Sequence, residues 1–280
     1  ANVYSRSGTT GTLGSTLTSG KNYLIEIHKA GLTSAKAANE DGSVNTTDTS
    51  ANTLSGFSIS RYTSTSTANQ TIGHGLDIAP EFVVHKALSQ AYSWAAYHVG
   101  LTSAAYKLIL DQTNAQVSDA TTFNSTAPTA TVNAVGSDSG TWRQSPTTDY
   151  VMYSWHSVEG YSSFGSYEGN ALTDGPFINT GFYPNAAMVK NIDSTTNWCL
   201  WDTAFKPDNG GGEFIYPDVT NIMSTTIYND FVSNGMKHGT ANAISNAANT
   251  YIYNSWGGRP MTDGAINQGR ADGNPGVART

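Results

Sequence analysis

The chain of 280 residues contains one cysteine, Cys199, which excludes an internal disulfide framework. Cys199 lies in the apolar segment 197–201 without a catalytic His pattern nearby, so we expect a buried and unreactive thiol. Charged residues are scarce too, at 12% of positions, about half the usual share for a soluble protein. This scarcity excludes a helical bundle or coiled coil, which would need abundant Ala, Leu, Glu, Lys and Arg.

Clusters of basic residues and long apolar runs are also missing. Lys and Arg total 14 against 21 acidic residues, giving a net charge of -7, and they are scattered singly. Because binding to phosphates needs grouped cations, we expect no nucleic-acid partner. No apolar stretch is long enough to cross a bilayer, so we expect no membrane insertion. The N-terminus lacks a charged start followed by an apolar core, so the sequence predicts no secretory signal peptide.

In place of these residues the sequence has many Ser, Thr and Asn, together with 28 Gly. The 15 Tyr, 9 Phe and 6 Trp supply enough apolar area for a packed core, which argues against disorder. Short strands joined by polar turns fit this mixture. The composition therefore predicts an all-β protein.

An internal repeat is visible in the sequence. Residues 80–86 align with 184–190 at an offset of 104, and Trp94 aligns with Trp198 at the same offset. Residues 149–153 align with 249–253 at an offset of 100. The changing offset indicates insertions and deletions, which belong in loops.

Each copy of the repeat is expected to fold as a series of strands punctuated by Gly, Ser, Thr, Asn and Pro. So many short strands in about 100 residues are typical of a β-sandwich, here of the concanavalin or jelly-roll kind. In the first copy the predicted strands are 56–63, 81–87, 92–98, 107–111, 129–135 and 150–155.

The fold prediction is therefore two tandem β-sandwich modules related by duplication and preceded by an extended N-terminal arm. The arm and a polar linker span 1–55, with one strand at about 22–28. The first module spans 56–159. The second spans 160–280 and ends in a Gly/Asn-rich tail. An arm so rich in Gly, Ser and Thr is expected to be flexible alone.

The repeat also serves to separate structural residues from functional ones, since both modules need the same core. Trp94 and Trp198 are therefore interpreted as core aromatics rather than sugar-binding platforms. Lys86 and Lys190 are interpreted as strand-end lysines that reach water.

The sequence offers no catalytic, cofactor or metal site. It has no His/Cys cluster with metal-ligand spacing and no strand-borne pair of acidic residues. We therefore expect a protein that is not an enzyme. A glycoside hydrolase whose carboxylates meet from distant positions stays open as an alternative.

Aromatic residues in or near the polar loops are the candidate recognition residues. Tyr combined with Ser, Gly and Asn is typical of adaptable binding surfaces. The alternative is that these aromatics pack beneath their own loops. The candidates are Tyr92, Tyr106, Trp142, Tyr161, Tyr167 and Tyr183, with Asp208 and Asn209 in a Gly-rich loop.

A group of segments carries a family resemblance, namely 56–63, 71–76, 79–80, 93–98, 159–170, 174–177 and 180–182. Together they resemble the tandem-repeat β domains of tail-fibre and other virion structural proteins of marine bacteriophages, the podoviruses of cyanobacteria and abundant ocean bacteria. The resemblance implies a virion role without catalytic residues. It also implies assembly with other copies, by analogy a homotrimer, and with other virion proteins.

The leading expectation is therefore a tail fibre or appendage on the exterior of the virion, made in the host cytoplasm. It would contact a glycan or protein receptor on the host surface. One alternative is a protein that decorates or cements the capsid. Another is a free, lectin-like glycan-binding module.

Overall fold

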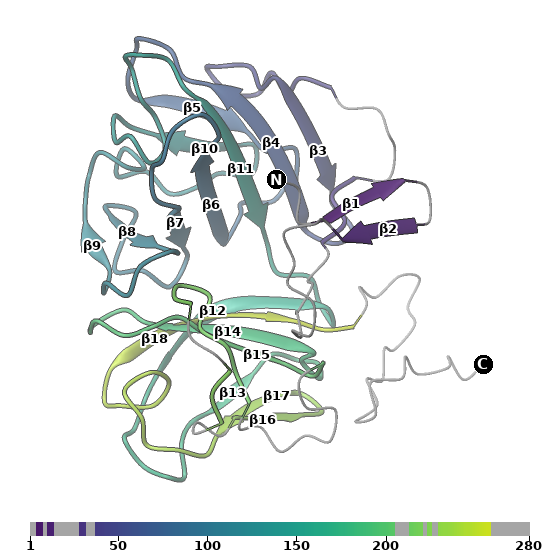
Figure 1. Ribbon diagram of the computed structural model, residues 1–280, viewed down its shortest axis with the longest axis vertical. Coiled ribbons are helices and arrows are strands. Elements are labelled where there is room, and N and C mark those ends of the chain that lie inside the picture. The colour runs from purple at the N-terminus through teal and green to yellow at the C-terminus, as the bar shows by residue number, and fades with distance from the viewer. Residues whose placement is uncertain are drawn as a thin grey trace.

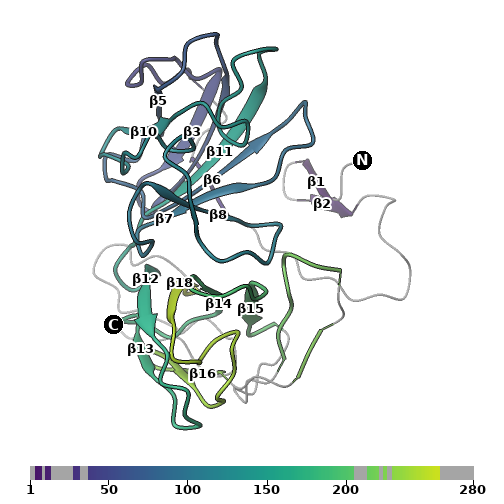
Figure 2. The same ribbon diagram turned by 90° about the vertical axis from the view of Figure 1, so that its left-hand side faces the viewer.

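The computed structural model describes residues 4–7, 10–13, 28–31, 37–204, 213–220, 223–225 and 229–258. Every named element in these residues is a β-strand, which confirms the all-β class. None of the described residues belongs to a helix that is long and apolar enough to cross a membrane. The strands between residues 48 and 155 are called the first half here, and those between 162 and 256 the second half. Figures 1 and 2 both place the first half above the second, so the halves meet along one face.

The first half contains a seven-stranded antiparallel sheet and a two-stranded sheet. The large sheet has the order β3 (Asp48–Asn52), β4 (Phe57–Thr63), β11 (Asp149–Trp155), β6 (Phe82–Ala87), β7 (Ala95–His98), β8 (Tyr106–Ile109) and β9 (Val117–Ser118). The small sheet pairs β5 (Gln70–Gly73) with β10 (Val132–Val135). A separate hairpin pairs β1 (Tyr4–Ser7) with β2 (Thr10–Leu13).

The second half contains a four-stranded and a three-stranded antiparallel sheet. The larger has the order β12 (Ser162–Glu168), β18 (Thr250–Trp256), β14 (Ala186–Asn191) and β15 (Cys199–Asp202). The smaller has the order β13 (Phe177–Asn179), β17 (Gly235–His238) and β16 (Asn229–Val232).

The central strands of the two large sheets follow the same order. In chain order and in pairing, β4-β11-β6-β7 corresponds to β12-β18-β14-β15. Tyr62 lies opposite Tyr150 in the first half, and Tyr167 lies opposite Tyr251 in the second. The ring centroids are 5.2 Å apart in the first pair and 5.1 Å apart in the second, and both pairs are stacked. The same aromatic pair thus stands at the same place in each half.

Both faces of each large sheet are covered. One face packs on the small sheet of its own half, and the other faces the large sheet of the other half. Phe82 of the first half stacks on Phe164 of the second at 6.3 Å, and both belong to one core cluster that also contains Met188 and Trp256. The middle strands β6 and β14 are buried along nearly their whole length and carry apolar residues with little alternation, whereas β4 and β12 alternate and expose part of their side chains.

Hydrogen bonds also join the two halves. The buried Lys190 ammonium donates to the backbone oxygens of Thr113, Asn191 and Thr196 at 3.1, 3.1 and 2.7 Å. The expectation that Lys190 reaches water was wrong, because the residue faces the other half and three carbonyls surround its Nζ. Trp198 is fully buried as expected, and its indole Nε1 donates to the Ile109 oxygen at 3.2 Å.

The stretch before residue 56 differs from the expected arm and linker. Residues 48–52 form β3, the edge strand beside β4, and the Thr49 and Ser60 hydroxyls lie 2.9 Å apart across that pair. Hydroxyl groups of Ser and Thr join this edge strand to β4. The sequence of β3 therefore lacks the apolar residues by which a core strand is recognised. Of the strand expected at 22–28, only His28 lies among the described residues. The tail beyond residue 258 lies outside them.

Candidate functional site

Trp142 is a core residue and presents no recognition surface. It is fully buried, its indole Nε1 donates to the Thr67 oxygen at 2.9 Å, and its ring stacks on Tyr62 at 6.0 Å. An indole buried in a core needs an acceptor for its N–H, and the Thr67 carbonyl provides one. The expectation that Trp142 belongs to a recognition loop was wrong, because its loop folds back onto the sheet.

Tyr167 is partly buried among aromatic neighbours. Its ring stacks on Tyr251 and on His238, the latter at 5.2 Å, and its hydroxyl donates to the Ser245 oxygen at 2.7 Å. Burial raises the pKa of this phenol well above its usual value, and the neighbouring Tyr251 adds to the effect. Tyr167 lies on β12 and packs, partly buried, against the core of the second half.

The other candidate residues lie apart from one another. Tyr106 is partly buried against the core cluster that contains Phe82 and Phe164. The rings of Tyr183 and Phe231 meet edge to face, with their centroids 6.3 Å apart. Tyr161 is partly buried beside the start of β12. Asp208 and Asn209 lie outside the described residues. Of the described residues, Tyr106, Tyr161 and Tyr183 share no common site.

Tyr92 is the candidate that lines a cavity. A polar cavity of about 270 Å³ lies beside it, on one side of the segment 91–95. Residues from β8 and from the loop before β11 form its other walls. The lining residues are Ala91, Tyr92, Ser93, Ala95, Lys107, Ile109, Asp138, Ser139 and Gly140.

Two carboxylates and one ammonium organise this polar cavity. Lys107 Nζ lies 2.7 Å from an Asp119 oxygen and 3.1 Å from an Asp138 oxygen. The other Asp138 oxygen accepts from the backbone N–H of Gly140 at 2.8 Å. Burial disfavours the charge on Lys107, but the two carboxylates outweigh it and raise the pKa of Lys107. The groups are therefore fixed ions suited to hydrogen bonding, and both carboxylates are engaged by the same cation.

A second cavity, the aromatic cleft, lies between the two halves. It has a volume of about 420 Å³ and is lined mainly by apolar side chains, including Tyr153, Trp155, Met188 and Trp256. Trp94 forms part of its wall, stacks on Tyr153 at 6.4 Å and lies 5.7 Å from the Lys86 ammonium. Trp94 is therefore only partly buried, whereas Trp198, its equivalent in the repeat, is fully buried. The Lys86 ammonium lies over the Trp94 ring instead of extending freely into water.

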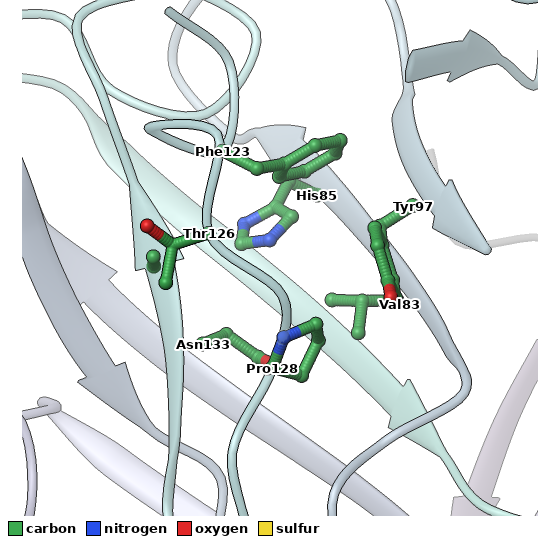
Figure 3. Close-up of a pocket in the computed structure, with 8 residues that line it drawn as sticks. Val83, His85, Tyr97, Phe123, Thr126, Pro128 and Asn133 are labelled. Atoms are coloured by element: carbon green, nitrogen blue, oxygen red, sulfur yellow. The ribbon is translucent and has the colours of Figure 1, made fainter. Parts of the chain in front are cut away.

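A third space is a small void in the core of the first half (Figure 3). Its volume is about 10 Å³, and the His85 ring points into it between Phe123, Tyr97 and Pro128. This is about the room that one water molecule needs and far too little for a ligand. The void is a feature of the core and not a binding site.

Metal-binding groups do not gather in the part of the chain that the structure describes. Across those residues, no cluster of three or more His, Cys, Asp or Glu could hold an ion. Cys199 is buried as expected, and burial raises the pKa of its thiol. The polar cavity and the aromatic cleft are two spaces in the described residues that are large enough to be considered for a ligand.

The fold and these cavities define an all-β protein of stacked antiparallel sheets with a polar cavity in one half and an aromatic cleft between the halves. The chain belongs to the family described as a domain of unknown function, DUF7483, whose model matches residues 4–260. No curated protein and no solved structure matches the chain.

Proposed function

We propose that the chain is a non-enzymatic structural protein of a bacteriophage virion, exposed on the particle in a tail fibre or similar appendage that contacts the host surface. The observation that carries the proposal is the stacking of four sheets, in which the large sheets of the two halves cover each other. Strand pairing and burial on this scale stabilise a protein without disulfides, as a particle outside cells requires. The resemblance to virion proteins of marine phages agrees with it.

The two halves are proposed to be copies of one β-sandwich module. The shared strand order and the stacked tyrosine pair at the same register in each half support this origin. Segments of the resemblance fall in this shared framework, since 56–63 includes β4 and 159–170 includes β12. They are accordingly structural residues rather than parts of a reactive cleft.

Assembly with other copies, as a homotrimer, and with other virion proteins is part of the proposal. Symmetric homo-oligomers are the common form of such assemblies. Light scattering on the purified chain tests this point. We expect three times the chain mass of 29.6 kDa, and the mass of a single chain would contradict it.

The position on the particle is tested by labelling intact virions with antibodies against this chain and imaging them by electron microscopy. Label on the tail appendage is expected. Label spread over the capsid shell would favour the alternative of a decoration or cement protein. If infected cells produce the chain but the virions released from them carry no label, the proposed role is overturned.

A glycan-binding, lectin-like function is the second candidate. The polar cavity favours it, because fixed ions and an aromatic wall are the groups that orient a small polar ligand. This candidate is compatible with the first, since an appendage that contacts a host needs a surface ligand to bind.

A further inference from the structure

The polar cavity beside Tyr92 has the character of a ligand site rather than of a packing defect. Its side chains come from three separate parts of the chain, namely 91–95, β8 and the loop at 138–140. We propose that it binds one neutral sugar unit of a glycan, an assignment that rests on the proposed contact with the host surface. Its volume of about 270 Å³ is close to the lower end of small-molecule pockets.

The charged groups in the cavity are held in place before any ligand arrives. Asp138 accepts from Lys107 Nζ with one oxygen and from the Gly140 N–H with the other. An ionised carboxylate has about four acceptor positions, so Asp138 keeps lone pairs for the hydroxyls of a ligand. The hydroxyl of Ser93 in the same wall accepts from the Gln112 amide at 3.1 Å, which leaves its own proton to donate. Binding to groups already fixed costs little ordering entropy.

The charge balance selects a neutral ligand. Two carboxylates, Asp119 and Asp138, surround the single ammonium of Lys107. The nearby Arg143 guanidinium lies 5.5 Å from the Tyr92 ring and donates to the Tyr92 hydroxyl. With Arg143 counted, the two carboxylates and the two cations balance, so the cavity offers no unpaired charge to attract an acidic or a basic sugar. A neutral pyranose supplies adjacent hydroxyls for the carboxylate and carbon-bound hydrogens for the wall formed by Tyr92.

The test is ligand-observed saturation-transfer NMR on the full chain with glucose, galactose, mannose, N-acetylglucosamine and glucuronate as probes. We expect transfer to at least one neutral sugar and none to glucuronate. Asp138→Asn should weaken that sugar's binding about tenfold or more, because a hydrogen bond to a charged group is lost. Ala91→Trp should abolish it by filling the exposed rim, while Ala241→Trp, at an exposed position in the second half, should bind as the parent does.

The circular dichroism spectrum and the melting temperature identify any variant that fails to fold. The Ala91→Trp variant keeps every polar lining group, so it tests the location even where Asp138→Asn is unstable. Absence of transfer to every neutral probe would overturn the sugar assignment, as would stronger transfer to glucuronate. Unchanged binding in Ala91→Trp would overturn the assignment to this cavity. None of these results bears on virion labelling, so the proposed structural role stands or falls separately.

Discussion

At the scale of single residues, the two repeated lysines show how one sequence position acquires two environments. Lys190 is fully buried and donates to three backbone oxygens, one of them from the other half. Lys86 is partly buried, donates to the Tyr92 oxygen and lies over Trp94. The two environments differ because the second half packs on the first at Lys190. The Thr113 oxygen of the first half accepts a hydrogen bond from Lys190, and it has no counterpart at Lys86.

Lys190→Met should destabilise the protein by roughly 2 kcal/mol or more, because buried carbonyls lose their donor. Lys86→Met is the matched control and should cost less, since one carbonyl in a partly exposed setting is affected. Urea unfolding at neutral pH measures both. Equal losses of unfolding free energy in the two variants would contradict the role assigned to Lys190.

Three buried histidines make the fold sensitive to acid. Burial lowers the pKa of His85, His98 and His238 to about 3. Their folded pKa lies below the unfolded value of 6.5, so the unfolded chain takes up protons first as the pH falls below 6.5. Each such histidine then costs up to about 1.4 kcal/mol of stability per pH unit. We expect full stability at pH 7.5 and a steep loss between pH 6 and 4, measured by urea unfolding. A flat profile between pH 7 and 5 would count against neutral, buried imidazoles.

The small void of Figure 3 is expected to hold one ordered water. The Tyr62 hydroxyl donates to the Thr141 oxygen at 2.6 Å, so at 2.9 Å it accepts from His85 Nδ1. His85 Nε2 is then an acceptor, and neither it nor the Asn133 Oδ1 atom has a protein partner. A water that donates to both satisfies them. A crystal structure should show density within about 3.2 Å of both atoms, and an empty void there would refute this assignment.

At the scale of elements, the sequence located most strands but not their register. The predicted 150–155 is β11 at Asp149–Trp155, and 81–87 is β6 at Phe82–Ala87. In the structure Tyr150 corresponds to Tyr251, an offset of 101, whereas the sequence alignment used 100. A slip of one residue exchanges the two faces of a strand. With most of both strands buried, the alternation that would fix the register is weak, and the strand pairing together with the stacked tyrosines reveals it.

The sequence could find Tyr92 through composition, but not the ions beside it. Lys107, Asp119 and Asp138 are far apart in the chain and form no local motif. They meet because the loops after β9 and β10 return to β8. The sequence places Trp142 in a polar loop and so suggests exposure. The loop folds back onto the sheet and buries the indole, which no local pattern predicts.

The stacked tyrosine pairs allow a test of equivalence between the halves. Tyr62→Phe removes a hydroxyl that donates to the Thr141 oxygen, and Tyr167→Phe removes one that donates to the Ser245 oxygen. Each should lower the unfolding free energy by about 1–2 kcal/mol, because each leaves a carbonyl without this donor. Thermal and urea unfolding measure the losses. A large cost in one half and none in the other would weaken the view that the pairs play the same structural part.

At the scale of the whole molecule, the contact between the two large sheets decides whether the halves behave as one unit. One apolar cluster runs through both, with Phe82 and Phe164 stacked across the boundary. Hydrogen bonds cross it as well, from the Gln116 N–H to the Ile192 oxygen at 3.1 Å and from the Thr196 N–H to the Thr113 oxygen at 3.0 Å. Separating the halves would expose the apolar outer face of each large sheet to water, so neither half has a complete core alone.

The full chain is therefore expected to unfold in a single transition, with the calorimetric and van't Hoff enthalpies equal. A substitution in the shared boundary should shift that whole transition. Met188 is buried there, so Met188→Asp, which places an unpaired charge in the apolar cluster, should lower the melting temperature without splitting the transition. Leu172→Asp, at an exposed position in the second half, is the control and should leave the melting temperature nearly unchanged. Two separate transitions in the parent chain would mean that the halves fold independently, and the stack of four sheets would then be an arrangement of two domains rather than one cooperative body.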